Sequence, residues 1–169
     1  NPDEIDYVMC THLHADHVGW NTQLNNGKWI PTFPNAKYIF SKIDYEFFNN
    51  VKENQPGYQS MKDSVKPIVE AGQASLVSND IDITKEISLM PSPGHTPGHY
   101  CINIKSENKN AILSGDLIHH PIQIARPEWR TNFCNDPEHA SKTRIEFVNT
   151  YTNTETMILA AHFAEPTAG

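Results

Sequence analysis

Three histidines and one aspartate lie within six consecutive positions near the start of this 169-residue chain, and this cluster limits the fold more than any other feature. The four residues are His12, His14, Asp16 and His17. Imidazole nitrogens and carboxylate oxygens are common ligands of divalent metal ions in proteins. The apolar segment 5–10 before them is typical of a β-strand. The sequence therefore predicts a metal site at the end of a strand.

The spacing of the four residues suggests two neighbouring ions. Residues two apart in an extended segment point the same way, so His12 and His14 can bind one ion together. Asp16 and His17 follow beyond the turn and can face a second ion beside the first. A chance histidine-rich loop is the alternative, and it is the weaker one for four ligand-type residues at a strand end.

Three later strand ends carry the same residue types. His95 lies in a turn rich in proline and glycine, residues 91–99, and Asp116 follows an apolar segment. His162 follows the last predicted strand, residues 156–161. Ligands on loops at one edge of a sheet form an open site on a rigid scaffold. Five histidines and two aspartates exceed the needs of one tetrahedral zinc ion, and they suit two ions that share a carboxylate.

Periodicity and turn residues predict a mixed α/β fold. Strands are expected at 5–10, 36–40, 74–77, 81–83, 86–90, 100–104, 111–113 and 156–161, and helices from 42, over 60–71 and from 137 to about 151. Pro67 would kink or split the second helix. The segment 117–135 is expected to be irregular and to line a pocket.

Composition excludes several classes of protein. The net charge of −7 gives no sign of a nucleic-acid or anionic-membrane partner. No apolar run approaches the roughly 18 residues that span a bilayer. The three cysteines, Cys10, Cys101 and Cys134, are widely spaced, which argues against a disulfide framework or a cysteine zinc site. Each cysteine is expected to be a small buried residue. We also expect a single domain over residues 1–169 and, by default, a cytoplasmic location.

The ligand pattern resembles that of the metallo-β-lactamase fold superfamily of dinuclear hydrolases, in spacing and order over about 150 residues. The resemblance implies an αββα sandwich and two metal ions. It places one ion on His12, His14 and His95, the other on Asp16, His17 and His162, with Asp116 bridging. The best-known subclass of true zinc β-lactamases has a cysteine at the position of Asp116, which argues against antibiotic hydrolysis as the main role.

The flanking segments 10–20, 31–36 and 115–121 are similar to the branch that holds N-acyl-homoserine lactone lactonases and methyl-parathion-type organophosphate hydrolases. This resemblance implies a metal-dependent hydrolase in which a bridging hydroxide attacks a small ester or lactone substrate. Zinc is the first choice of metal, with iron, manganese, cobalt and nickel as alternatives. His119 matches a position that assists the substrate carbonyl or leaving group, so the expected catalytic residues are Asp16, Asp116 and His119. A histidine packed at a loop start is the alternative for His119.

Members of this superfamily normally have strands before the histidine motif and continue after the last histidine ligand. The chain is therefore expected to be an internal piece of a longer protein, incomplete in its first sheet. An exposed strand edge and apolar face should result, and a homodimer that covers them is expected. Three alternatives remain open: a phosphotriester or thioester hydrolase, an inactive metal-binding fragment, and a di-iron protein that would need a flavin domain.

Overall fold

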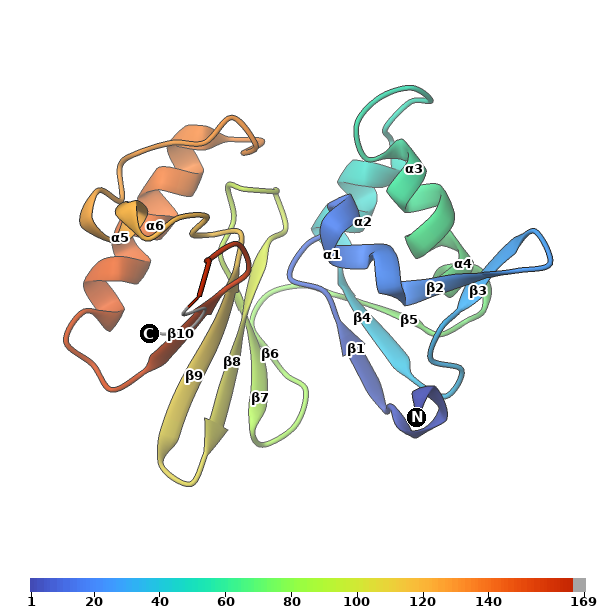
Figure 1. Ribbon diagram of the computed structural model, residues 1–169, viewed down its shortest axis with the longest axis horizontal. Helices are drawn as coiled ribbons and strands as arrows, with labels where there is room; N and C mark the ends of the chain where they lie inside the picture. Colours follow the sequence, from blue (N-terminus) through green and yellow to red (C-terminus); the bar gives the residue numbers. More distant parts are fainter. Residues whose placement is uncertain (166–169) are drawn as a thin grey trace. The chain divides into compact units, whose positions relative to one another are not determined.

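The computed structural model describes residues 1–165, which form two compact units (Figure 1). The first unit is Asn1–Ser78, and the second begins at Asn79. Each unit has its own sheet and its own helices, so the predicted mixed α/β fold class is confirmed. That the two units form a single domain stays a prediction.

The first unit contains a three-stranded parallel sheet in the order β1-β4-β5. Its strands are β1 (Tyr7–Met9), β4 (Lys37–Ser41) and β5 (Ala74–Val77). Pairing with β4 covers only the residues of β1, which is why this strand is shorter than the predicted 5–10. A separate antiparallel hairpin joins β2 (Thr22–Asn25) to β3 (Lys28–Pro31). Its turn residues Asn26 and Gly27 both have positive φ, as two-residue hairpin turns require.

Short helices surround the sheet of the first unit. They are η1 (Pro2–Glu4), α1 (Ala15–Val18), η2 (Gly19–Asn21), α2 (Lys42–Asn49), α3 (Tyr58–Ser60), η3 (Met61–Val65) and α4 (Lys66–Glu70). The hydroxyl of Ser41 accepts a hydrogen bond from the Asp44 amide and caps α2, which begins at the predicted residue. A π-helical turn ends at Val65, and Pro67 lies in the first turn of α4. The prediction that Pro67 interrupts the helix is confirmed.

The core of the first unit joins the strands to the segment that carries the first histidines. Its buried members are Cys10, Leu13, Val18, Ala36, Tyr38, Phe40, Phe48, Met61, Val65 and Ile68. Leu13 and Val18 lie on either side of the pair Asp16-His17, so their burial fixes the ligand segment onto the sheet. The hydroxyl of Tyr38 donates to the carbonyl of Asn21, which anchors the end of the same segment.

The second unit contains a five-stranded sheet in the order β10-β9-β8-β7-β6. Its strands are β6 (Ile81–Asp82), β7 (Ile87–Pro91), β8 (Tyr100–Ser106), β9 (Lys109–Gly115) and β10 (Met157–Ala160). All neighbours are antiparallel except β10 and β9. β8 and β9 extend beyond the predicted bounds because Glu107 and Asn108 adopt positive φ and form a two-residue turn.

Two helices accompany this sheet, α5 (Ile122–Ala125) and α6 (Pro137–Tyr151). α6 lies against one face of the sheet, where Phe147 packs with Cys101, Ile112, Leu117 and Ile118 (Figure 1). The Asp136 carboxylate accepts a hydrogen bond from the His139 amide and caps α6. α5 corrects the expectation that 117–135 is wholly irregular, since the imidazole Nδ1 of His120 accepts the Ile122 amide at the start of this short helix.

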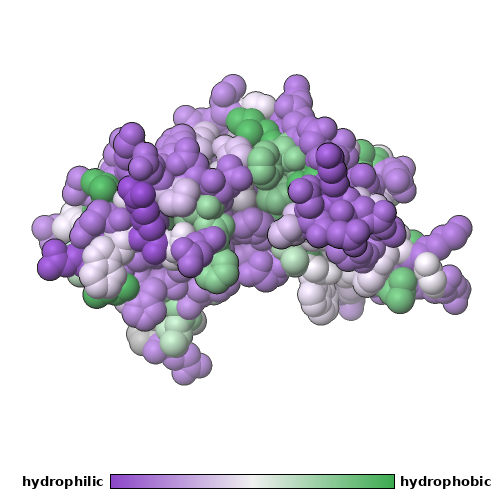
Figure 2. All heavy atoms as spheres, turned by 90° about the horizontal axis from the view of Figure 1, so that it is seen from above, coloured by the Kyte–Doolittle hydropathy of each residue, from purple (hydrophilic) through white to green (hydrophobic). Residues whose placement is uncertain are grey.

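Most of the surface drawn in Figure 2 is hydrophilic, with small groups of apolar residues between the polar ones. Among the exposed large apolar side chains are Trp20, Trp129 and Phe133. None of the helices within residues 1–165 has the length and apolar character needed to cross a membrane.

Candidate metal centre

The first unit brings its four predicted ligands into one cluster. The Nε2 atom of His12 lies 3.1 Å from Nδ1 of His14, and the ring centroids of His12 and His17 are 4.1 Å apart. The Asp16 Oδ2 atom lies 3.4 Å from Nε2 of His17. His12 is buried, and its Nδ1 atom lies 3.1 Å from the Thr11 hydroxyl, which leaves Nε2 directed at His14. Nitrogen and oxygen donors therefore converge at the start of α1.

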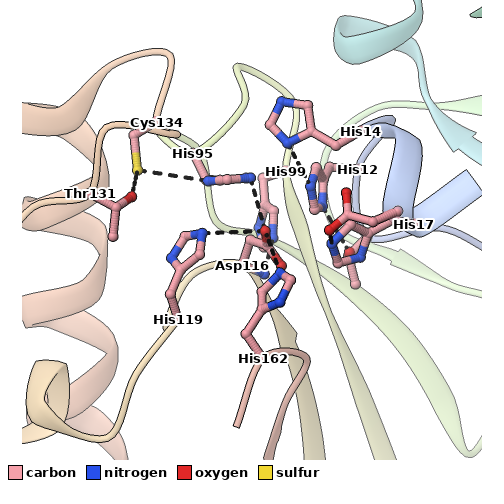
Figure 3. Close-up of polar contacts among 12 residues, drawn as sticks. His12, His14, His17, His95, His99, Asp116, His119, Thr131, Cys134 and His162 are labelled. Carbon is pink, nitrogen blue, oxygen red and sulfur yellow. Dashed lines mark hydrogen bonds and ion pairs between the residues drawn. The ribbon is translucent and has the colours of Figure 1, made fainter. Parts of the chain in front are cut away.

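In the second unit, imidazoles converge on one carboxylate oxygen (Figure 3). The Nε2 atoms of His95 and His162 each lie 3.2 Å from Oδ2 of Asp116, and Nε2 of His119 lies 3.3 Å from it. The His95 and Asp116 side chains are almost fully buried, whereas His162 is 40% exposed. All three residues predicted as ligands in this unit are thus brought together, along with the predicted catalytic His119.

A tight turn before β8 positions His95. The Ser92 amide donates to the His99 carbonyl, and the Gly94 amide donates to the Thr96 carbonyl. Gly94 has a φ of +128°, a backbone conformation that side chains disfavour. The proline- and glycine-rich sequence here forms the predicted stiff turn and fixes the backbone of His95.

His99 holds the backbone of Asp116. The Asp116 amide donates to Nε2 of His99 at 3.1 Å, and Nδ1 of His99 lies 2.7 Å from the Ser92 hydroxyl. Because Nε2 accepts, the ring proton is on Nδ1 and is donated to Ser92. These contacts give the His99 ring a structural role beside the cluster.

Arg144 secures the segment that follows Asp116. It is buried, and its guanidinium donates to the carbonyls of Leu117, Pro127 and Trp129. Burial lowers the pKa of this guanidinium from its usual value. The Gln123 side chain also holds this segment, since it accepts a hydrogen bond from the His119 amide and donates one to the Trp129 carbonyl. The sequence places Arg144 in the buried stripe of α6 without indicating these partners.

The His119 ring packs near the rings of His95, His162 and Phe133. The His119 ring is parallel to that of His162, with centroids 5.5 Å apart, and it stacks on Phe133 at 6.2 Å. Both ring nitrogens of His119 are buried. Within the described residues 1–165, Nδ1 makes no hydrogen bond, and Nε2 lies 3.3 Å from Oδ2 of Asp116 without hydrogen-bond geometry. A buried polar group without a hydrogen bond is costly, so this ring is suited to receive a partner from outside the chain.

The three cysteines differ in their surroundings. Burial raises the pKa of Cys10 to about 11 and that of Cys101 to about 12, which agrees with the expectation of small buried residues. Cys134 is only half-buried, so the same expectation is wrong for it. Its sulfur lies 3.7 Å from Nδ1 of His95, a contact that sequence spacing gives no sign of.

The residues of both clusters fit divalent metal ions. Each unit gathers imidazole nitrogens and a carboxylate oxygen at the ends of strands, and these are donors that zinc, iron, manganese and cobalt accept. The other ring nitrogens of His12 and His95 are near Thr11 and Cys134, which leaves one nitrogen of each ring for an ion.

Comparison with known proteins identifies relatives for most of the chain. The family model described as the metallo-beta-lactamase superfamily matches residues 1–158. The N-acyl homoserine lactonase AiiA of Bacillus thuringiensis subsp. kurstaki is 27% identical over 112 residues, which are 66% of this chain and 38% of the relative. The N-acyl homoserine lactonase AttM of Rhizobium radiobacter is 28% identical over 116 residues, 67% of this chain and 41% of the relative.

Solved structures with the same fold are also longer than this chain. The dizinc quorum-quenching lactonase AidC matches all of the chain with a TM-score of 0.86 and 24% identity, and 61% of AidC is covered. The hydrolase AbOPH of the beta lactamase superfamily gives a TM-score of 0.84 at 24% identity, with 60% of that chain covered. The family model matches nearly the whole sequence, and the solved structures have the same fold as this chain. This chain therefore belongs to the metallo-β-lactamase superfamily.

Proposed function

We propose that the chain is the metal-binding part of a hydrolase that opens a lactone or cleaves a similar small ester. The observation that carries the proposal is the convergence of the His95, His119 and His162 imidazoles on Oδ2 of Asp116. The relatives named N-acyl homoserine lactonase support the reaction class. They are about two and a half times as long as the matched part, so the activity belongs to the protein as a whole.

The proposed ligand sets are those that the family resemblance implies. His12, His14 and His95 would hold one divalent ion, and Asp16, His17 and His162 would hold the other, with Asp116 as a ligand of both. Zinc is the proposed metal, because imidazole and carboxylate suit it and AidC is described as a dizinc lactonase. Two bound divalent ions supply Lewis acidity and lower the pKa of water, so that a nucleophile forms near neutral pH.

In this proposal His119 handles a proton during ring opening. Hydrolysis breaks the bond between the acyl carbon and the ring oxygen. Water supplies a hydroxyl to the carbon and a proton to the ring oxygen. Nε2 of His119 is 3.3 Å from the Asp116 carboxylate, in a mostly buried site, and can deliver that proton to the leaving oxygen. Phe133 stacks on His119 and offers an apolar surface for the substrate next to the reacting group.

Metal content tests the proposal directly. Elemental analysis of the purified chain should find two equivalents of metal, and Asp116→Ala should lose the bridged pair and the activity together. His139→Ala is a matched control, because His139 is an exposed histidine on α6. Full metal content or full activity in Asp116→Ala would rule the proposed centre out.

A substrate panel separates the remaining alternatives. Lactones, phosphotriesters, thioesters and β-lactams should be compared at equal metal loading, and the proposal expects the lactone to be turned over fastest. Preference for a phosphotriester or thioester would keep the centre and change the substrate. Two bound metals without turnover of any substrate would favour the inactive metal-binding fragment.

A further inference from the structure

We propose that Cys134 is a positioning residue that accepts the Nδ1 proton of His95 and thereby keeps Nε2 of this ring directed at Asp116. The inference rests on the metal centre proposed above, and it adds a residue to it. The sulfur of Cys134 lies 3.7 Å from Nδ1 of His95, while Nε2 of the same ring lies 3.2 Å from Oδ2 of Asp116 (Figure 3).

The segment around Cys134 is tied to the His95 turn by backbone hydrogen bonds. The Asn135 amide donates to the His95 carbonyl at 2.8 Å, and the Asp136 amide donates to the Gly94 carbonyl at 2.9 Å. The Thr143 hydroxyl of α6 donates to the Pro93 carbonyl at 2.8 Å. These bonds fix the Cys134 backbone relative to the His95 backbone, so the approach of thiol to imidazole is built into the fold.

A metal-binding nitrogen needs its lone pair, which determines where the single proton of a neutral imidazole is. If Nε2 of His95 binds an ion, the ring proton must be on Nδ1, and the Cys134 sulfur 3.7 Å away can accept it. Cys134 can in turn donate its own S–H to the Thr131 hydroxyl, which is 3.4 Å away. The imidazole then donates a hydrogen bond to the thiol, and the thiol donates one to the hydroxyl.

Metal-binding histidines usually place the second ring nitrogen against a carboxylate, a backbone carbonyl or water, and losing that partner weakens metal binding. A neutral thiol is a weaker acceptor than these groups. Cys134 should therefore fix the tautomer and direction of His95 without greatly raising the basicity of the ring.

Packing alone is the competing explanation for Cys134, and two substitutions separate it from positioning. Cys134→Val keeps an apolar side chain but removes the acceptor, whereas Cys134→Ser keeps an acceptor in a smaller side chain. If Cys134 positions His95, the serine variant should resemble the native protein more than the valine variant does. If Cys134 only fills space, the order should be reversed. Cys10→Ala is the control, since the Cys10 thiol contacts Asn21 in the other unit.

The first measurement uses the zinc-loaded chain, in which an ion on Nε2 leaves the ring proton of His95 on Nδ1. The exchange of this imidazole proton with solvent can be followed by ¹H–¹⁵N NMR. Native protein, Cys134→Ser and Cys10→Ala should show slow exchange of the proton, and Cys134→Val should show faster exchange. An unchanged exchange rate in Cys134→Val overturns the inference, and this result does not depend on whether the protein is a hydrolase.

The second measurement is zinc affinity by competition with a chelator. Cys134→Val should bind zinc about 10–100-fold more weakly than the native chain, with Cys134→Ser closer to native. In the cobalt-substituted native protein, a sulfur-to-cobalt charge-transfer band would show that Cys134 is itself a ligand and would overturn the positioning role. A native chain that binds no metal contradicts the proposed function, whereas a chain that binds zinc and keeps the same exchange rate in Cys134→Val contradicts the Cys134 inference alone.

Discussion

Gly94 approaches Ala140 so closely that a Cβ atom on the glycine would lie 2.2 Å from the Ala140 backbone nitrogen. This close approach joins the His95 turn to the first residues of α6. Gly94 also has a φ of +128°, so a side chain here would be strained even without the close contact.

Gly94→Ala should lower the free energy of unfolding by about 3 kcal/mol or more, because conformational strain and overpacking add. It should also displace His95 and weaken metal binding. Denaturant unfolding and chelator competition measure the two effects. Gly72 has a φ of +72° and open space around it, so the loss of unfolding free energy in Gly72→Ala should come from backbone strain alone. Equal effects of the two substitutions would contradict the importance of the Gly94–Ala140 contact.

Arg144→Met should destabilise the second unit by about 3 kcal/mol, because it removes a charged donor from three carbonyls in a buried place. Arg144→Lys should recover only part of the loss, since an ammonium cannot reproduce the planar arrangement of guanidinium donors. Denaturant unfolding gives the difference. Lys142→Met, an exposed change on the same helix, should stay close to native; a similar loss there would point to a general effect of charge.

Cys134 should react with iodoacetamide well before the other two thiols in the folded chain. Burial raises the pKa of Cys10 to about 11 and of Cys101 to about 12, so both stay protonated and shielded near pH 8. Peptide mass spectrometry identifies the labelled cysteine, and labelling in guanidinium chloride should make all three react. Early modification of Cys101 would contradict its burial.

The same pKa shifts predict a loss of stability at alkaline pH. Above the usual thiol pKa, the unfolded chain loses the Cys10 and Cys101 protons, whereas the folded chain retains them until pH 11 or 12. The unfolded state is thus favoured increasingly as the pH rises above about 9. Unfolding free energies measured from pH 7 to 10 should fall less steeply in Cys101→Ala than in the native chain.

Self-association at the β10 edge of the second unit is a separate prediction from the homodimer expected at the incomplete first sheet. β10 is an outer strand of its sheet, Met157 on it is 52% exposed, and a cavity of about 610 Å³ lined by Phe147, Ile158 and Phe163 adjoins it. Met157→Lys should shift the chain toward monomer in light scattering. Asp82→Lys, at the opposite edge strand β6, serves as the control. A native chain that is already monomeric would remove the basis for the expected homodimer.

The starts of α2 and α6 could be predicted from the sequence because their causes are local. Ser41 and Asp136 cap their helices through their own side chains, Pro67 interrupts a helix through its ring, and Asn26-Gly27 permits a tight turn. Strand lengths were predicted less well. β1 is short and β9 is long because the extent of a strand depends on its partner, which lies elsewhere in the sequence.

The ligand-type residues were also recognisable from sequence, since histidine and aspartate at successive strand ends indicate metal chemistry without knowledge of distances. Which atoms meet was decided by tertiary structure alone. Cys134 is 39 residues from His95, and Arg144 is 27 residues from Leu117, yet packing of α6 and its preceding loop brings each pair into contact. Spacing along the chain carries information only over a few residues, whereas the partners of a buried donor or ring nitrogen are fixed by how the sheet and helix pack.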